Sequence, residues 1–469
     1  MVFSSITFLF AFLPAVLLAY YISPKAVKNL ILMLFSLLFY AWGEPKYILV
    51  MLTSIIVGYT MGILTDDFKK ANKIKQAKIA TALSITVNLG ILFFFKYIGF
   101  FTENINNVPG IDIKPLNIAL PIGISFYTFQ ILSYAIDVYT EKAKVQKNII
   151  NLATYITLFP QLIAGPIVRY ETVAEELDNR RENIDDFGEG AKRFIIGLGK
   201  KVLIANVASE IFEQLSSLPA GENSVALSWI CAIAFSLRIY FDFAGYSDMA
   251  IGLGKMFGFH FLENFNYPYI SKSITDFWRR WHISLSSWFR DYVYIPLGGN
   301  RGGKIKTLRN IFIVWLLTGF WHGAAWNFVI WGLYYFVLLM AEKLFLGKLL
   351  EKIPTVFSRI YALFFINLGW VIFAYDDIGK LGTALKNMFG MNGLSLCNQL
   401  TIFTLLSYGV FFVIAFIGST PLPKKFMNYI STKTKIYDGI EVVLLLVVMM
   451  LSTAFLASDA FNPFLYFRF

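Results

Sequence analysis

Two histidines in tryptophan-rich segments are the side chains of this chain best suited to acid–base chemistry. The sequence contains only three histidines, of which His282 lies in DFWRRWHISLSSWFRDY and His322 in TGFWHGAAWN. An ionisable side chain at membrane depth costs roughly 2.5 kcal/mol or more to insert, so it is retained mainly where it has a function. A neutral imidazole shielded from water can take a proton from an alcohol, which accelerates a reaction by roughly 10² to 10⁴. His322 is therefore predicted to act as a general base. The alternative is a structural imidazole bonded to a carbonyl of a neighbouring helix.

The sequence around His322 predicts that it sits near the middle of one long apolar helix. Gly319 and Gly323 would make that helix thin beside the imidazole, so that another backbone or a substrate can approach. Thr318 and Trp326 would lie one turn away on the same face. Trp321 and Asn327, which flank these positions, are further candidates for contact with a substrate or a channel.

The segment around His282 alternates cationic and aromatic residues: Trp278, Arg279, Arg280 and Trp281 directly precede it. This pattern predicts an amphipathic helix at the membrane interface or beside a water-filled channel. A basic helix that only anchors the chain fits the pattern equally well. The third histidine, His260 in GKMFGFHFLENF, is predicted to be structural.

A further polar group lies in the apolar run RIYFDFAGYSDMAIGLG. Its candidate substrate or channel residues are Tyr240, Asp242, Ser247 and Asp248. Unpaired carboxylates in such surroundings are costly, so both are predicted to bond Arg238 or the arginines beside His282. A catalytic role for them remains an alternative. No metal site is expected, because metal-ligand spacings such as H-E-x-x-H are absent.

The composition predicts an all-α polytopic membrane protein. Hydrophobic residues make up 57% of the 469 residues and charged residues only 15%, which excludes an ordinary soluble domain. Apolar runs near 20 residues long recur from residues 2–21 to residues 442–456, and we expect about eleven spans. Residues 1–469 are predicted to form one membrane-embedded domain, since no internal repeat or linker divides them. Its motifs concentrate at about residues 120–331.

The distribution of basic residues predicts the topology. Lysines gather in alternate loops, at Lys25 and Lys28, at residues 69–78 and at residues 142–147, and an outside N-terminus makes all three loops cytoplasmic. The formal charge of +11 then reflects membrane topology, and nucleic acid is not an expected partner. Residues 169–193 become cytoplasmic only if FPQLIAGPIVRY is re-entrant, with Pro160, Gly165 and Pro166 as helix breakers. The first apolar segment is predicted to be a retained helix.

Two other features carry no chemistry. GGNRGGK at residues 298–304 matches a phosphate-binding loop formally, but Ile305 replaces the required Ser or Thr, so a tight turn at the membrane interface is expected. The two cysteines, Cys231 and Cys397, cannot form a disulfide framework or a zinc site. Apolar surroundings suppress the thiolate, so a cysteine nucleophile is not expected.

Five motifs resemble a known family. They are LPIGISFYTFQ (120–130), FPQLIAGPIVRY (159–170), YFDFAGYSDMAIGLG (240–254), FWRRWHISLSSWFRDYVYIPLGGNR (277–301) and TGFWHGAAWNF (318–328). Together they are similar to the membrane-bound O-acyltransferases, and within them to the alginate O-acetyltransferase branch that includes peptidoglycan O-acetylation subunits. The resemblance implies a ring of tilted helices, with re-entrant and interfacial helices, around a central channel. It also implies that His322 is the family's near-invariant histidine and His282 its partner position.

The resemblance further implies the reaction. We expect an acetyl group to move from a cytoplasmic donor, acetyl-CoA or another acyl thioester, across a bacterial plasma membrane to O-acetylate an extracytoplasmic polysaccharide such as alginate, peptidoglycan or a secondary wall glycan. No bound cofactor is expected. The outward loops are too short to grip a polymer, so a separate extracytoplasmic acetyl-accepting protein is expected as a partner, besides the lipid bilayer. Alternatives are D-alanyl transfer by the same fold, a structural scaffold, and a transporter or flippase, although the inverted repeats typical of transporters are not seen.

Overall fold

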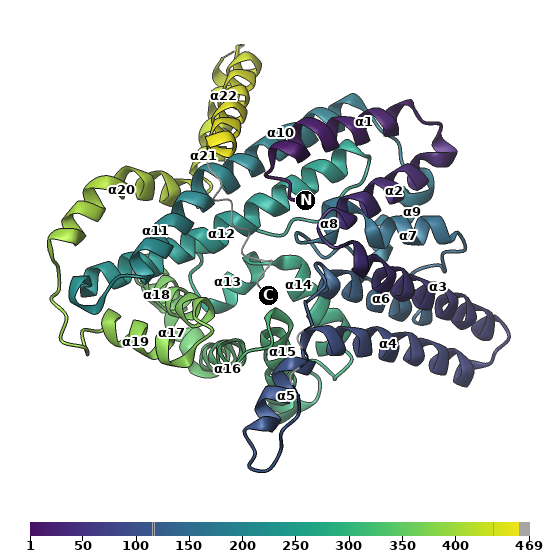
Figure 1. Ribbon diagram of the computed structural model, residues 1–469, viewed down its shortest axis with the longest axis horizontal. Helices are drawn as coiled ribbons and strands as arrows, with labels where there is room; N and C mark the ends of the chain where they lie inside the picture. Colours follow the sequence, from purple (N-terminus) through teal and green to yellow (C-terminus); the bar gives the residue numbers. More distant parts are fainter. Residues whose placement is uncertain (115, 117, 435, 459–469) are drawn as a thin grey trace. The chain divides into compact units, whose positions relative to one another are not determined.

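Helices and loops make up the described part of the protein. The computed structural model describes residues 1–458 apart from 115, 117 and 435, and none of these residues lies in a β-strand (Figure 1). Seven described helical segments are long and apolar enough to cross a membrane: Pro45–Lys70, Ile74–Lys96, Val225–Met256, Trp326–Lys352, Thr355–Ala374, Gln399–Gly418 and Tyr437–Ser458. A shorter apolar segment covers Phe8–Ile22. The predicted all-α polytopic class is confirmed, whereas the expected count of about eleven spans is not.

The chain forms two compact units. Unit 1 contains residues 1–194 and 246–262, and unit 2 contains residues 195–245 and those from 263 onward. Two helices, α10 (Ile184–Gly199) and α12 (Val225–Met256), each contribute residues to both units.

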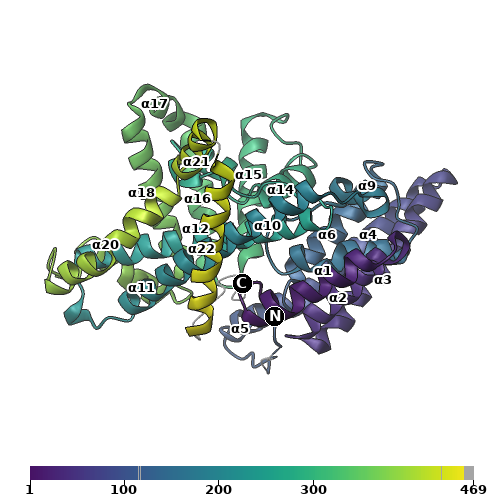
Figure 2. The ribbon, with the colours of Figure 1, turned by 90° about the horizontal axis from the view of Figure 1, so that it is seen from above.

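Unit 1 is built on an antiparallel hairpin of long helices. Its other helices are α1 (Leu13–Ile22), α2 (Lys28–Ala41), α5 (Ile98–Asn106), α6 (Ile124–Tyr139), α7 (Ile149–Thr157), α8 (Phe159–Leu162) and α9 (Tyr170–Asn179). The hairpin helices α3 (Ile48–Lys70) and α4 (Ile74–Lys96) lie side by side with α6 (Figures 1 and 2). A Cβ added at Gly62 of α3 would lie 2.9 Å from the ring of Tyr134 on α6. A small residue therefore sets the close approach of these two helices, as is common in membranes.

The predicted helix break in FPQLIAGPIVRY is present. Helix α7 ends at Thr157, and Pro160 lies in the first turn of the four-residue α8, where its missing N–H costs nothing. Gly165 has φ +104°, a conformation that favours glycine. The whole stretch from Leu158 to Val168 is buried. Its re-entrance into a membrane stays a prediction.

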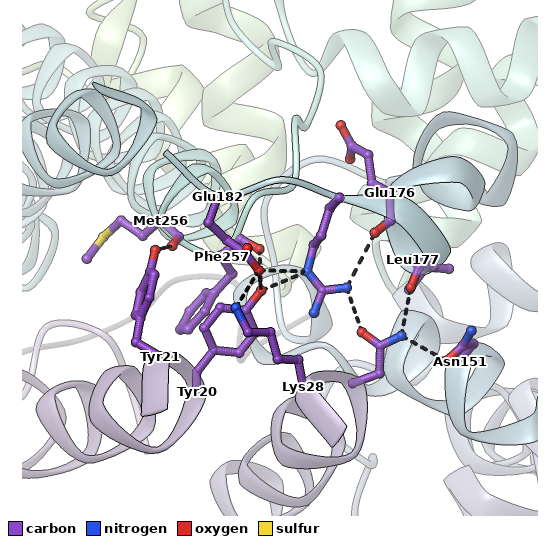
Figure 3. Close-up of polar contacts among 11 residues, drawn as sticks. Tyr20, Tyr21, Lys28, Asn151, Glu176, Leu177, Glu182, Met256 and Phe257 are labelled. Atoms are coloured by element: carbon purple, nitrogen blue, oxygen red, sulfur yellow. Dashed lines mark hydrogen bonds and ion pairs between the residues drawn. The ribbon is translucent and has the colours of Figure 1, made fainter. Parts of the chain in front are cut away.

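A buried polar network fixes the mixed-charge segment that follows (Figure 3). Arg180 donates from Nε to the hydroxyl of Tyr20 at 2.8 Å and from Nη1 to Asn29 Oδ1 at 2.6 Å. Glu182 accepts from Tyr20 and, at 3.0 Å, from Lys28 Nζ. Burial opposes ionisation of Glu182, but these hydrogen bonds outweigh it and hold the pKa of that carboxyl below its usual value. The segment between α9 and α10 is thereby tied to α1 and α2.

Unit 2 contains the remaining helices. They are α11 (Asn206–Ser216), α13 (Ile274–Arg280), α14 (Ile283–Phe289), α15 (Gly303–His322), α16 (Trp326–Ala341), α17 (Gly347–Lys352), α18 (Thr355–Ala374), α19 (Ile378–Met388), α20 (Gln399–Gly418), α21 (Leu422–Lys433) and α22 (Tyr437–Ser458). The turn before α15 contains Gly298 and Gly299, and α15 begins at Gly303; all three have positive φ, in agreement with the predicted tight turn. Helices α15 and α16 pack along each other as a hairpin (Figure 1).

The prediction of one continuous helix through His322 is wrong. His322 is the last residue of α15, Gly323 is extended, and α16 begins at Trp326, so Thr318 and Trp326 do not share a helix. A Cβ at Gly323 would lie 2.2 Å from the ring of Phe328, which leaves no space for a side chain there. Sequence periodicity missed the break because the flanking apolar residues continue on both sides of it.

The hairpin of α15 and α16 requires glycine at its crossing point. A Cβ at Gly319 would lie 2.3 Å from the carbonyl oxygen of Phe328, closer than real contacts allow. Replacing an interior helical glycine by alanine normally gains up to about 1 kcal/mol. We expect Gly319→Ala instead to cost about 1–3 kcal/mol, because the helices must separate. Lower thermal stability of the purified protein in detergent is the expected measurement.

The matched control is Gly382→Ala in α19, where an added Cβ meets nothing within 4 Å. This variant should be as stable as the wild type or slightly more so. Equal stability of the two variants would contradict the packing argument.

Candidate active site

His282 lies at a sharp break between two short helices. Helix α13 is capped by the side chain of Ser273 and ends at Arg280, and α14 begins at Ile283. His282 itself has φ +44°, in the left-handed region, and is only 1% exposed. The prediction of one amphipathic interfacial helix is therefore wrong. The break turns the imidazole inward, and a continuous helix would not present it in this way.

The aromatic and cationic residues that precede the break differ in burial. Trp278 and Trp281 are buried, whereas Arg279 is exposed and Arg280 Nε donates to Asp276 Oδ1 at 2.8 Å. The ring of Trp281 packs against Trp370 with centroids 4.6 Å apart, and against Tyr240 at 6.2 Å. These contacts anchor the segment to α12 and α18 within unit 2.

The imidazole of His282 has a close polar partner in Asn264, a longer contact of 3.4 Å from Nδ1 to Ser284 Oγ, and an aromatic enclosure. Its Nδ1 lies 3.0 Å from Asn264 Oδ1, and Phe243 meets the ring edge to face at a centroid distance of 4.6 Å. Trp321 lies at 5.9 Å. Burial lowers the pKa of His282 well below its usual value, and the electrostatic interaction with the neighbouring imidazole of His322 acts in the same direction. Both effects favour the neutral form of the His282 imidazole.

His322 occupies an aromatic cage on the other side of Trp321. It is 4% exposed, and its ring contacts Trp321, Trp331 and Phe373 with centroids 5.0, 5.1 and 5.3 Å away. The buried side chain of Asn327 donates to the carbonyl of Phe373 at 3.3 Å and of Ile372 at 3.5 Å. Asn327 thus ties the end of α18 to the start of α16, beside His322. Both predicted histidines come together around Trp321.

Two connected cavities open on the His282 side. A cavity of about 260 Å³ is lined by His282, Trp278, Arg279 and Thr318, among others. A larger one of about 860 Å³ shares Arg279 and Trp315 with it and reaches the start of α18 at Thr355 and Ser358. Glu342 on its wall accepts bonds from the backbone N–H groups of Ile274 and Thr275, and so holds the start of α13.

A separate cavity lies at the other end of α18. It has a volume of about 540 Å³ and is lined by Val371, Ala374 and Tyr375 together with residues of α11, α12 and α19. Its lining mixes aromatic with polar side chains, including Phe212, Asn223, Lys380 and Asn387. Phe373, in the same stretch of α18, contacts His322. His282 thus lines a cavity itself, whereas His322 lines none of the three and contacts Phe373, a neighbour in sequence of the cavity-lining Ala374.

The predicted carboxylates are paired, but with other partners than expected. Asp242 contacts Lys201 Nζ at 2.6 Å, with both side chains 2% exposed, and Asp248 contacts Arg193 at 2.9 Å. Arg238 instead lies 3.5 Å from Glu213. The expected pairing with Arg238 or the arginines beside His282 is thus wrong. The basic partners come from α10 and the residues directly after it, and the spacing of residues along the sequence does not show which of them faces α12.

The remaining candidates differ in their surroundings. Ser247 and Asp248 belong to unit 1, whereas Tyr240, Asp242 and both site histidines belong to unit 2. His260 is 51% exposed in unit 1 and contacts Glu176 Oε1 through Nδ1 at 2.7 Å, as suits a structural residue. Cys231 is buried and Cys397 exposed. Within the described part of the chain, no group of three His, Cys, Asp or Glu side chains is arranged to hold a metal ion.

The sequence of this chain is similar to that of known membrane enzymes. A model of the membrane-bound O-acyltransferase family matches residues 138–375, which include Asp242, His282 and His322. The chain belongs to the membrane-bound O-acyltransferase family. The resemblance carried by its sequence motifs is confirmed, and this O-acyltransferase is therefore an enzyme.

The O-acyltransferase has relatives with several named activities. It is 38% identical to the probable alginate O-acetylase AlgI of Azotobacter vinelandii, over 100% of both chains. It is 35% identical to the peptidoglycan O-acetyltransferase of Helicobacter pylori, over 85% of this chain and 81% of the relative. The teichoic acid D-alanyltransferase of Bacillus subtilis is 32% identical over 55% of this chain and 70% of the relative.

The buried pair of Lys201 and Asp242 allows a structural role to be separated from a catalytic one. Asp242→Asn leaves an uncompensated buried cation, so we expect it to destabilise the O-acyltransferase by about 3–5 kcal/mol. The double substitution of Lys201→Met with Asp242→Leu removes both charges and should restore most of the thermal stability. Acyl transfer should return with it. A double variant that is stable and correctly inserted but inactive would contradict the structural role.

Proposed function

We propose that this O-acyltransferase moves an acetyl group from a cytoplasmic acyl thioester across a bacterial plasma membrane, for the O-acetylation of an extracytoplasmic polysaccharide. The observation that supports this most is the pair of buried histidines around Trp321, with cavities at opposite ends of α18. A helix of 20 residues, the length of α18, spans about 30 Å, the thickness of a bilayer core. A donor and an acceptor can thus approach the histidines from opposite faces of a membrane.

In this proposal His322 is the general base. Its imidazole takes the proton of the acceptor hydroxyl while the hydroxyl oxygen attacks the thioester carbonyl. The tetrahedral intermediate then expels the thiolate, and the proton passes from His322 to the leaving sulfur. The indole N–H of Trp331 has no hydrogen-bond partner among the described residues, and its ring contacts that of His322. A buried donor of this kind suits a developing oxyanion.

The charge distribution supports a cytoplasmic donor. Three basic residues, Lys272, Arg279 and Lys343, line the 860 Å³ cavity, whereas one, Lys380, lines the 540 Å³ cavity; it is the 860 Å³ cavity that carries more basic charge. Basic residues collect on the cytoplasmic side of membrane proteins, so this cavity is the proposed entrance for acetyl-CoA or another acyl thioester. In the same topology the N-terminus lies outside.

The acceptor in this proposal is a hydroxyl carried on a separate extracytoplasmic protein. The 540 Å³ cavity is large enough for a small segment or a sugar unit, but not for an extended polymer. A second enzyme would then acetylate the polysaccharide. The names of the relatives support acetylation of alginate or peptidoglycan. D-alanyl transfer is the second candidate, supported by a relative that matches a smaller share of this chain.

The general-base role can be tested with two histidine variants. His322→Ala should reduce polymer O-acetylation in cells to below about a tenth of the wild type, because base catalysis contributes roughly 10² to 10⁴ in rate. His260→Ala is the matched control, since this histidine is exposed and belongs to unit 1. It should keep near-normal activity. Both variants must be present in the membrane in equal amounts, and retained activity of His322→Ala would overturn the assignment.

The relay through a partner can be tested by reconstitution. Purified protein in lipid vesicles, supplied with acetyl-CoA on the proposed cytoplasmic side and polymer on the other, should modify little or no polymer, because no cleft for an extended chain is expected. Addition of the acetyl-accepting protein should restore transfer. Efficient acetylation of the polymer without any partner would overturn the relay while leaving the acyltransferase activity intact.

A further inference from the structure

Asn264 makes a cluster of short polar contacts beside His282. This buried residue lies in the loop between α12 and α13, and its Oδ1 is 3.0 Å from His282 Nδ1. The same oxygen is 2.9 Å from Ser284 Oγ and 3.3 Å from the backbone nitrogen of Ser284. One side-chain oxygen therefore meets three groups of the opposite segment.

These contacts determine which atom of the imidazole carries the proton. The backbone N–H of Ser284 can only donate, so the amide atom of Asn264 that faces it must be the carbonyl oxygen. His282 Nδ1 contacts that same oxygen and must also donate. Ser284 Oγ, 3.4 Å from Nδ1, directs its single hydrogen to Asn264 Oδ1 and so is not the donor to Nδ1. A neutral imidazole has one N–H, so Nε2 is left with a lone pair. Burial and the neighbouring His322 both favour this neutral form, because they lower the pKa of His282.

The lone-pair atom is buried and available. His282 Nε2 is shielded from solvent and has no hydrogen-bond partner among the described residues. His282 also lines the 260 Å³ cavity, together with Trp278 and Thr318. A buried polar atom without a partner costs about 1–3 kcal/mol, so its retention next to a cavity indicates a ligand.

The backbone around the histidine is held by the same loop. Ile283 N–H donates to the carbonyl of Asn264 at 3.0 Å, and Asn266 N–H donates to the carbonyl of Arg280 at 2.9 Å. The left-handed conformation of His282 costs of order 1–3 kcal/mol for a residue other than glycine. These bonds, on both sides of His282, stabilise a strained turn that a continuous helix would avoid. Strain of this kind persists where the surrounding contacts fix it.

We propose that Asn264 is a positioning residue that holds His282 in the Nδ1–H tautomer, so that Nε2 accepts a hydrogen bond from an N–H or O–H group of the ligand in the 260 Å³ cavity. The identity of that ligand rests on the proposed function, whereas the tautomer does not. Either the acyl donor or the hydroxyl acceptor supplies the N–H or O–H. When this hydrogen bond to Nε2 is lost, the KM should rise more for the substrate that supplies the N–H or O–H group than for the other substrate.

The tautomer can be measured directly by nitrogen NMR. The chain has three histidines, so protein labelled with ¹⁵N-histidine in lipid vesicles gives three pairs of ring signals. His260→Gln and His322→Gln each remove one pair and identify that of His282 by elimination. We expect a protonated Nδ1 and an unprotonated Nε2 for His282 in the wild type. An Nε2–H tautomer or a fully protonated ring at pH 7 would overturn the proposal, whatever the activity of the protein.

The functional consequence is tested with two substitutions of Asn264. Asn264→Ala removes the acceptor and should lower kcat/KM roughly ten- to hundredfold, the usual effect of losing a group that orients a functional histidine. Asn264→Asp keeps an acceptor for His282 and Ser284 and should retain much more activity. Its carboxylate raises the pKa of His282, so the protonated, inactive form persists to higher pH. The acid limb of the pH profile should therefore shift to higher pH.

Asn266→Ala is the matched control, because this residue lies on the same loop, is exposed, and uses its backbone rather than its side chain. It should behave as the wild type. An equal loss of activity in Asn264→Ala and Asn264→Asp, with an unshifted acid limb and normal thermal stability, would overturn the positioning role. If the wild type transferred no acyl group at all, the proposed function would fail while the NMR result still decided the tautomer.

Discussion

Buried polar groups must find partners inside the protein, and this constraint governs the centre of the enzyme. An isolated charge or an unpaired amide in an apolar interior costs several kcal/mol, and lipid offers no hydrogen bonds in exchange. Lys201 therefore pairs with Asp242, and Asn327 bonds the carbonyls exposed where α18 ends. Asn264 does the same for the turn at His282. At these two places an asparagine side chain bonds backbone groups at the end of a helix or at a turn between helices.

Close packing of small and aromatic residues also fixes the positions of the two histidines. Glycines at 319 and 332 bring α15 and α16 together, which fixes the position of His322 at the end of α15. Trp278, Trp331 and Tyr335 pack edge to face at centroid distances of 4.8 to 5.4 Å and fill the space around the histidines with rigid rings. Aromatic rings bury much area with few rotatable bonds, so they can hold an imidazole in one orientation.

The sequence is sufficient to single out the candidate residues but not the geometry that surrounds them. The class of fold, both histidines and their tryptophan neighbours follow from composition, family motifs and the cost of burying ionisable groups. The breaks at His282 and Gly323 do not, because apolar periodicity continues through them and their cause is contact with distant residues. Asn264 is 18 residues from His282, and Phe373 lies on another helix. Likewise, the choice of Lys201 over Arg238 as the partner of Asp242 depends on which side chain faces α12.

The cavity at the end of α18 is separate from the two cavities near its start. An enzyme that passes a group from one face of a membrane to the other must do so without opening a continuous path for water and ions. The residues that line the 540 Å³ cavity are all different from those that line the cavities of 260 and 860 Å³. None of these three cavities is lined by Trp321, His322 or Phe373. The ring of His322 contacts both of the other two rings. Under the proposed function, only the acyl group and the attacking oxygen need to meet there, and neither substrate has to cross. A site that is closed by aromatic rings is compatible with acyl transfer across a sealed membrane, whereas a water-filled channel of the same length is not.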